Sequence, residues 1–176
     1  MHQCPAPSFG AAWPGWIGSL PMDNRPLPDW PEFYAARRIE PYVRLLRDSD
    51  RLDAAGVAVF DRLAERLPGL AGPPEQPARI HGDLWSGNVV WGTAAAWLVD
   101  PAAHGGHRET DLAMLALFGM RFRDRLLAAY QEVSPLAEGW PDRVTLHQVH
   151  PLLVHAVLFG GSYLSAALAA AAKSVS

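Results

Sequence analysis

The sequence predicts a single domain of the α+β class that is mostly helical and carries one small β insert. Its 176 residues are enough for one hydrophobic core and too few to suggest two. About half of the residues (49%) are apolar and 19% are charged, as in ordinary globular proteins. Strand-like pieces occur only within residues 78–100, and the segments after residue 30 on either side of them read as helices. We therefore expect one domain over residues 1–176, with a Pro/Trp-rich segment at 1–30 and a helical body at 31–176.

The N-terminal segment is dominated by residues that do not favour helices. Residues 1–31 hold seven of the sixteen prolines, and proline breaks helices because it lacks a backbone N–H. We expect either an extended arm pinned by its tryptophans or an interior segment that has become exposed; the tryptophans are Trp13, Trp16 and Trp30. Asp29 has the position of a helix N-cap, and "PEFYAARRIEPYVRLL" then predicts a helix over 31–46 with a kink at Pro41.

The remaining elements follow in order along the chain. A helix near 51–67 should end at Pro68-Gly69, and "AGPPEQP" should be a loop. The expected strands are 78–81, 88–91 and 96–99, and the expected later helices are 109–118, 121–132, 142–159 and 162–172. Residues 152–172 carry no formal charge, but His155 and Gly160-Gly161 interrupt them. We expect two buried helices that meet at the glycines and not a membrane span.

Charge and cysteine usage narrow the class of protein. The net charge of −3 gives no sign of a nucleic-acid partner. The single cysteine, Cys4, cannot form an internal disulfide, and no signal peptide is evident, so a cytoplasmic location without a membrane partner is expected. The Trp-rich start and the Ala-rich end could expose apolar surface, which would favour a homo-oligomer.

The polar residues of the β insert suggest a metal site beside a reactive carboxylate. A hairpin with its turn near Ala94 would place Asn88 opposite Asp100, with Cβ atoms about 5 Å apart. An amide oxygen and a carboxylate at that separation can share Mg²⁺, which prefers oxygen ligands and keeps sites for substrate phosphate. Asp83 precedes the hairpin in a loop with Gly82 and could orient or deprotonate an attacking hydroxyl. This spacing matches the phosphoryl-transfer arrangement of kinases.

Each of these residues also has an ordinary structural explanation. Asp83 could form an Asx-turn, Asn88 could flank a hairpin, and Asp100 before Pro101 could start a turn. The three together, at this spacing, favour the kinase interpretation. His81 is expected to support the loop by hydrogen bonding.

Longer stretches of the chain resemble the fructosamine kinase (ketosamine-3-kinase) family, within the wider group of aminoglycoside-phosphotransferase-like and protein-kinase-like folds. The resemblance covers nearly the whole chain and rests on "GWIGSLPMDN" at 15–24, "HGDLWSGN" at 81–88, "VDPAAHGGHRETDLAMLALFG" at 99–119 and "HQVHPLLVHAVLFGGSYL" at 147–164. It implies that Asp83 is the catalytic aspartate and that Asn88 and Asp100 bind the metal. It also implies that Asp111 supports the catalytic loop. The residues expected on the substrate side are Trp85, His104, Arg108 and Glu109.

The same resemblance implies a reaction and an architecture. The reaction would be phosphorylation of a sugar hydroxyl on a ketoamine, either a small molecule or a glycated protein, with ATP as co-substrate and Mg²⁺ as cofactor. The chain would correspond to the C-terminal lobe only, without the N-terminal lobe. The only lysine, Lys173, cannot be the strand lysine that holds ATP phosphates in kinases. We expect this chain alone to be weakly active or inactive, as a fragment or as a naturally short protein.

Other functions remain open from the residues alone. His104 and His107 form a His-x-x-His pair to which His81 could add a third ligand, as in a metal-dependent hydrolase. A kinase-like lobe could also serve as a non-catalytic binding module. A glycosidase using Asp83 and Asp100 would leave Asn88 unexplained.

Overall fold

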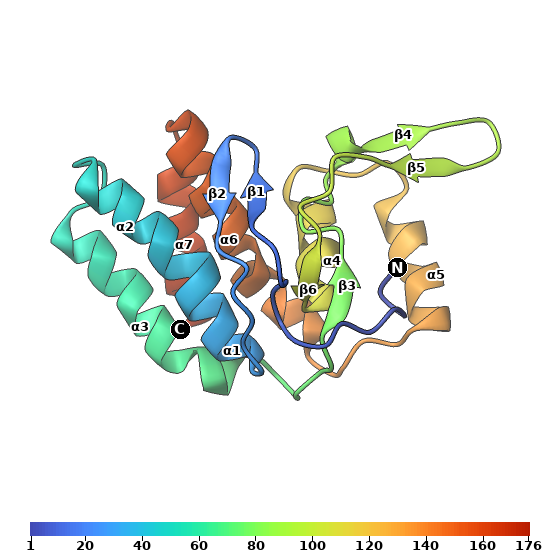
Figure 1. Ribbon diagram of the computed structural model, residues 1–176, viewed down its shortest axis with the longest axis horizontal. Coiled ribbons are helices and arrows are strands. Elements are labelled where there is room, and N and C mark those ends of the chain that lie inside the picture. Colours follow the sequence, from blue (N-terminus) through green and yellow to red (C-terminus); the bar gives the residue numbers. More distant parts are fainter.

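The computed structural model describes all 176 residues and confirms a mostly helical α+β architecture. Its strands form three separate two-stranded antiparallel sheets. Figure 1 shows helices α2 (Glu40–Asp48), α3 (Ala54–Leu70), α6 (Trp140–Phe159) and α7 (Tyr163–Ser174) gathered on one side. Helices α4 (Arg108–Leu117) and α5 (Arg123–Val133) lie on the other side, with the strands between residues 78 and 106. The two sides meet where α4 packs against α6.

The N-terminal segment folds back as a small hairpin. Strands β1 (Gly15–Ile17) and β2 (Leu20–Met22) pair in register, while the residues before them run along β3 and β6 through isolated bridges. Trp13 and Trp16 are 63% and 62% exposed, whereas Trp30 is buried. The expectation of an arm pinned by its tryptophans is therefore wrong for two of the three, because backbone pairing holds the segment.

The kink expected at Pro41 takes the form of a π-helical segment. Helix α1 (Trp30–Phe33) leads into the π-helix η1 (Tyr34–Ile39) and then into α2 (Glu40–Asp48). The Asp29 side chain caps α1 by accepting from the Glu32 amide at 3.1 Å, as predicted. The π segment turns Arg38 into the interior, where its guanidinium donates to the Asp23 carbonyl at 2.7 Å and to Asn24 Oδ1 at 2.6 Å.

The helical core is built by α3 (Ala54–Leu70), α6 (Trp140–Phe159) and α7 (Tyr163–Ser174). Helix α3 continues past Pro68 to Leu70, so the predicted end at residue 67 is wrong by three residues. Gly160 and Gly161 separate α6 from α7 with positive φ angles of 66° and 63°, which confirms two helices meeting at the glycines. None of the helices is both long enough and apolar enough to cross a membrane.

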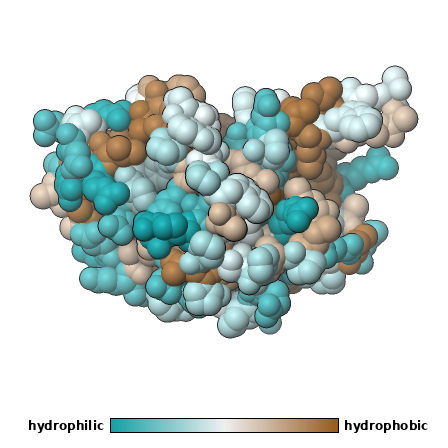
Figure 2. Space-filling view, viewed as in Figure 1, coloured by the Kyte–Doolittle hydropathy of each residue, from teal (hydrophilic) through white to brown (hydrophobic).

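The β insert holds two sheets. Strand β3 (Ala78–Ile80) pairs with β6 (His104–Gly106), which the sequence analysis did not predict. Strands β4 (Val89–Trp91) and β5 (Ala96–Leu98) form a hairpin that projects from the body, as Figure 1 shows. Figure 2 shows apolar surface where this hairpin joins the body.

The register of this hairpin differs by one residue from the prediction. Val89 pairs with Leu98, so Asn88 lies opposite Val99 and not opposite Asp100. The Val99 amide accordingly donates to the Asn88 carbonyl at 3.0 Å. The turn is one residue shorter than a centre at Ala94 requires, because Gly92 closes it by donating to the Ala95 carbonyl at 2.9 Å.

Candidate active site

The loop between β3 and β4 is held by a buried carboxylate. Asp111 lies in the first turn of α4 (Arg108–Leu117) and is 1% exposed. Its two oxygens accept from the backbone amides of His81 at 2.7 Å and Gly82 at 2.9 Å. A charged acceptor binding consecutive amides fixes the backbone just before Asp83. These are the contacts that the expected loop-supporting role of Asp111 requires.

His81 connects the same loop to the end of β5. Its Nε2–H donates to the Val99 carbonyl at 3.0 Å, and its Nδ1 accepts from the Asp83 amide at 3.3 Å. The ring is 2% exposed, so both nitrogens are committed to the backbone. This geometry suits a buttress and leaves no imidazole nitrogen for chemistry.

Asp83 and Asn88 lie in direct contact at the other end of the loop. The Asn88 side-chain amide donates to the Asp83 carboxylate and to the Asp83 carbonyl, both at 2.9 Å. A short 3₁₀ turn, Ser86–Asn88, brings the asparagine back towards the aspartate. The amide nitrogen is thereby used, and the Asn88 oxygen remains as a potential metal ligand.

Asp100 reaches this region by a different route from the one expected. It follows Val99, the backbone partner of Asn88, and has a left-handed φ of 51°. A left-handed residue ends the regular strand alternation, and aspartate tolerates this conformation better than most residues do. Asp100 is exposed, and it lies one residue after Val99, the residue opposite Asn88. The donor types, one amide oxygen and carboxylates, still suit Mg²⁺.

A cavity of about 320 Å³ opens beside Asp83. The loop between β3 and β4, α4, α6, α7 and the β1–β2 turn line it, and Figure 2 shows a notch in the upper outline between the two sides of the molecule. Trp85 lies on its wall. Burial raises the pKa of Asp83 above its ordinary value, while the hydrogen bond from Asn88 opposes this shift. A raised pKa makes the Asp83 carboxylate a better proton acceptor.

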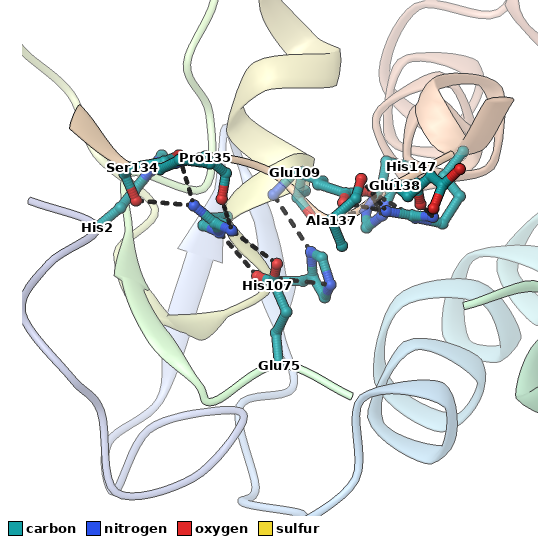
Figure 3. Close-up of polar contacts among 12 residues, drawn as sticks. His2, Glu75, His107, Glu109, Ser134, Pro135, Ala137, Glu138 and His147 are labelled. Carbon is teal, nitrogen blue, oxygen red and sulfur yellow. Dashed lines mark hydrogen bonds and ion pairs between the residues drawn. The ribbon is translucent and has the colours of Figure 1, made fainter. Parts of the chain in front are cut away.

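Three residues expected on the substrate side lie away from this cavity. His104 is buried, with its Nδ1 donating to the Ala102 carbonyl at 2.8 Å. Arg108 forms a two-pronged ion pair with Glu75 at 2.8 Å, and Figure 3 shows Glu75 close to His107 in this polar cluster. Glu109 is 3% exposed and pairs with Arg143. These three residues make buried or ion-paired contacts around α4, and none of them lines the cavity beside Asp83.

The same contacts contradict a zinc site built on His104 and His107. The group of His, Cys, Asp and Glu side chains close enough to share an ion consists of His107, Glu109 and His147, without His81 or His104. Within it, both Glu109 oxygens bind Arg143, at 2.6 and 2.9 Å. Figure 3 shows His107 and His147 on either side of Glu109. The Arg143 guanidinium thus already pairs with both Glu109 oxygens that a metal ion would need.

Sequence reasoning missed most of the cavity wall. Four of its residues lie far in sequence from the loop that carries Asp83: Phe118 directly follows α4, His155 and Phe159 belong to α6, and Tyr163 begins α7. One signal was available: His155 is a polar residue within the uncharged run 152–172. Its Nδ1–H donates to the Pro151 carbonyl at 2.7 Å, and its ring packs on Phe118 at a centroid distance of 4.7 Å.

The fold is that of kinase-like proteins. An aspartate and an asparagine on a loop that a buried carboxylate supports also match the kinase arrangement. The chain belongs to the fructosamine kinase family, because the family model described as "Fructosamine kinase" matches residues 1–175. Sequence and structure comparisons agree on this family.

Curated relatives and solved structures are similar over almost the whole chain. A probable ketoamine kinase of Enterococcus faecium is 38% identical over 165 residues, which are 93% of this chain and 59% of that protein. One from Escherichia coli K12 is 34% identical, over 93% of this chain and 56% of the relative. A Thermobifida fusca crystal structure, described as a fructosamine-3-kinase, has 55% identity and a TM-score of 0.96 over 99% of this chain and 60% of that one. A Haemophilus somnus structure with 23% identity and a TM-score of 0.86 shares the fold. The chain thus spans somewhat more than half the length of these relatives.

Proposed function

We propose that this chain forms the ketoamine-binding and hydroxyl-activating part of an ATP-dependent ketoamine kinase. The proposal rests on the position and the hydrogen bonding of the Asp83 carboxylate. Its carboxylate is half-buried on the cavity wall, and only one of its oxygens accepts a hydrogen bond, from Asn88. The other oxygen is available for a substrate hydroxyl. Membership of the fructosamine kinase family supports a sugar hydroxyl of a ketoamine as the acceptor.

In this proposal Asp83 orients the attacking hydroxyl and takes its proton. Phosphoryl transfer depends on positioning and electrostatic stabilisation more than on covalent catalysis. The loop supplies positioning because His81 and Asp111 fix the backbone on the N-terminal side of Asp83. The Asn88 amide fixes the carboxylate itself. A proton acceptor with a raised pKa is better matched to work near neutral pH.

Asn88 and Asp100 are the proposed holders of Mg²⁺. The Asn88 oxygen is unused by its own hydrogen bonds, and Asp100 is exposed next to the backbone partner of Asn88. When bound, the ion would neutralise charge on the ATP phosphates. Both residues are oxygen donors, as Mg²⁺ requires.

We further propose that residues 1–176 correspond to the C-terminal lobe of the complete kinase. The only lysine, Lys173, lies in the last turn of α7 and does not line the cavity beside Asp83. The lysine that pairs with ATP phosphates in kinases would then have to come from outside these residues. Each charge-assisted bond that it would make contributes about 1.5–3 kcal/mol, so the 176-residue chain should turn over poorly by itself.

A chimera with the Thermobifida fusca relative tests the function of the site. This chain would replace the matched 60% of that protein, where the TM-score of 0.96 indicates a compatible backbone. We expect the chimera to phosphorylate the ketoamine of propylamine and glucose, and Asp83→Asn to lower kcat by roughly 10²–10⁴-fold. Asp61→Asn, on the exposed face of α3, is the matched control. Near-normal kcat for Asp83→Asn would refute the role of Asp83, and a folded but inactive chimera would refute the kinase function.

A further inference from the structure

The cavity beside Asp83 has an unusual distribution of charge and aromatic surface. Its lining includes two carboxylates, Asp83 and Asp111, and no lysine or arginine. The Asp111 oxygens are already used by the catalytic loop, so Asp83 is the carboxylate available to a ligand. The cavity therefore favours a ligand that carries positive charge or none.

Aromatic rings form a continuous row along one wall. Trp85 contacts Phe118 edge-on at a centroid distance of 6.0 Å, Phe118 packs on His155 at 4.7 Å, and His155 packs on Tyr163 at 5.1 Å. Phe159 extends the row to the surface, where it is 68% exposed. Aromatic faces attract ammonium groups and cover apolar chains, but they offer nothing to a carboxylate.

His155 adds a hydrogen-bond acceptor to this wall. Because its Nδ1–H donates to the Pro151 carbonyl, the neutral ring keeps a lone pair on Nε2, which has no partner in the structure. Asp83 is an acceptor as well. The cavity thus presents two acceptors beside aromatic faces, which suits an N–H donor with a positive charge.

We propose that this cavity binds the amine half of the ketoamine, as a secondary ammonium with an apolar substituent, and rejects ketoamines that carry a carboxylate next to the amine. This inference rests on the proposed function and narrows its substrate class. A carboxylate on the carbon beside the nitrogen would enter the cavity without a lysine or arginine to pair with, close to the Asp83 carboxylate. An unpaired charge taken out of water near a like charge is unfavourable, so the cavity discriminates by repulsion.

Three matched ligands test the inference by calorimetric titration of the 176-residue chain. They are the 1-deoxyfructosyl derivatives of propylamine, of glycine and of glycine methyl ester, which are similar in size and differ in charge. We expect the propylamine and ester derivatives to bind and the glycine derivative to bind at least about tenfold more weakly. Equal or tighter binding of the glycine derivative would overturn the inference.

A charge added to the wall provides the second measurement. Phe159→Arg places a cation on the exposed end of the aromatic row and should narrow or reverse the preference against the glycine derivative. Val133→Arg, at a residue that is 70% exposed and does not line the cavity, should leave the preference unchanged. An unchanged preference in Phe159→Arg would count against the cavity as the amine site.

The two proposals can fail separately. If the ligands bind in the expected order but the chimera transfers no phosphate, the kinase function fails and the cavity assignment stands. If the chimera phosphorylates the glycine derivative as efficiently as the propylamine derivative, the function stands and the charge discrimination is wrong. If none of the three ligands binds and no phosphate is transferred, both are refuted.

Discussion

His2 and Asp111 lie 2.9 Å apart, imidazole Nε2 to carboxylate oxygen, although 109 residues separate them in the chain. The carboxylate is the same one that binds the amides of His81 and Gly82. The other nitrogen of His2 accepts from the Tyr130 hydroxyl at 2.9 Å. His2 therefore supports the loop between β3 and β4 through the Asp111 carboxylate that binds its amides.

Removing this brace should loosen the loop. His2→Ala deletes a hydrogen bond to a charged group and should cost about 1–3 kcal/mol of unfolding free energy, measured by urea denaturation. Hydrogen exchange at the amides of His81 and Gly82 should accelerate. Tyr130→Phe, which removes only the outer bond, is the milder comparison. Unchanged exchange at those two amides in His2→Ala would show that the brace does not reach the loop.

Gly82 is the position at which the loop tolerates least change. Its φ is 82°, and a Cβ there would collide with the Ala102 carbonyl oxygen. Gly82→Ala should therefore destabilise the protein by more than about 1 kcal/mol and lower kcat of the chimera, because Asp83 is the next residue. Gly69→Ala is the control, since a Cβ at Gly69 meets nothing. Comparable thermal stability of the two variants would contradict this reading of the loop.

The metal-binding proposal predicts a shift in Mg²⁺ dependence. Removing divalent metal from the chimera with a chelator should abolish phosphate transfer. Asp100→Asn removes one ligand charge and should raise the Mg²⁺ concentration for half-maximal rate by about tenfold or more. Asp61→Asn should not. If Asp100→Asn had the parent's Mg²⁺ dependence, the ion would have to be held elsewhere.

The buried ion pair between Glu109 and Arg143 should be costly to break. Burial tends to raise the pKa of Glu109, but the His147 ring, whose Nε2 lies 3.4 Å from Glu109 Oε2, and the hydrogen bonds from Arg143 outweigh it and lower this pKa to about 2. Glu109→Gln would leave the Arg143 guanidinium buried without its counter-charge, at a cost of about 3–5 kcal/mol in urea unfolding. Glu109→Gln combined with Arg143→Met should recover part of this loss. A double variant less stable than Glu109→Gln would indicate that Arg143 contributes mainly through its other contacts.

Four buried histidines should make the domain sensitive to acid. Burial lowers the pKa of each of them below its ordinary value of 6.5, to about 3 for His107; the others are His104, His147 and His150. Below pH 6.5 the unfolded chain binds protons that the folded protein does not bind, so stability present above pH 6.5 is lost as the pH falls. Each histidine can contribute up to about 1.4 kcal/mol per pH unit. The melting temperature should therefore fall steeply between pH 7 and pH 5, and His147→Gln should make this fall less steep. A melting temperature that stays constant over this pH range would contradict the prediction.

The sequence predicted the helices well because their boundaries depend on local signals. Asp29 caps α1, and Gly160 and Gly161 separate α6 from α7, as the residue types indicated. The hairpin register was missed by one residue because Gly92 closes a shorter turn than the symmetric choice assumed. Strand β6 was missed because the run His104–Gly106 has no strand propensity and is held by pairing with β3.

The candidate site was predictable where its residues are close in the chain. Asp83 and Asn88 were found from their spacing and lie in contact. The aromatic wall was not found, because Phe118 and Tyr163 meet at His155 only through the packing of separate helices. His104 and Glu109 were assigned to substrate by their place in a motif, and the structure uses them for burial and ion pairing.

The π-helical segment Tyr34–Ile39 has a consequence for insertions and deletions. A π turn holds one residue more than an α turn, and each residue of an α-helix advances the phase by about 100°. Deleting a single residue within this segment would restore an uninterrupted α-helix. The part of the chain before Tyr34 would then rotate by about 100° about the helix axis relative to α2. Arg38 would then swing away from Asn24, and the β1–β2 hairpin that forms the rim of the cavity would lose its anchor. The length of one helical turn thus controls the shape of a binding site to which none of its residues belongs.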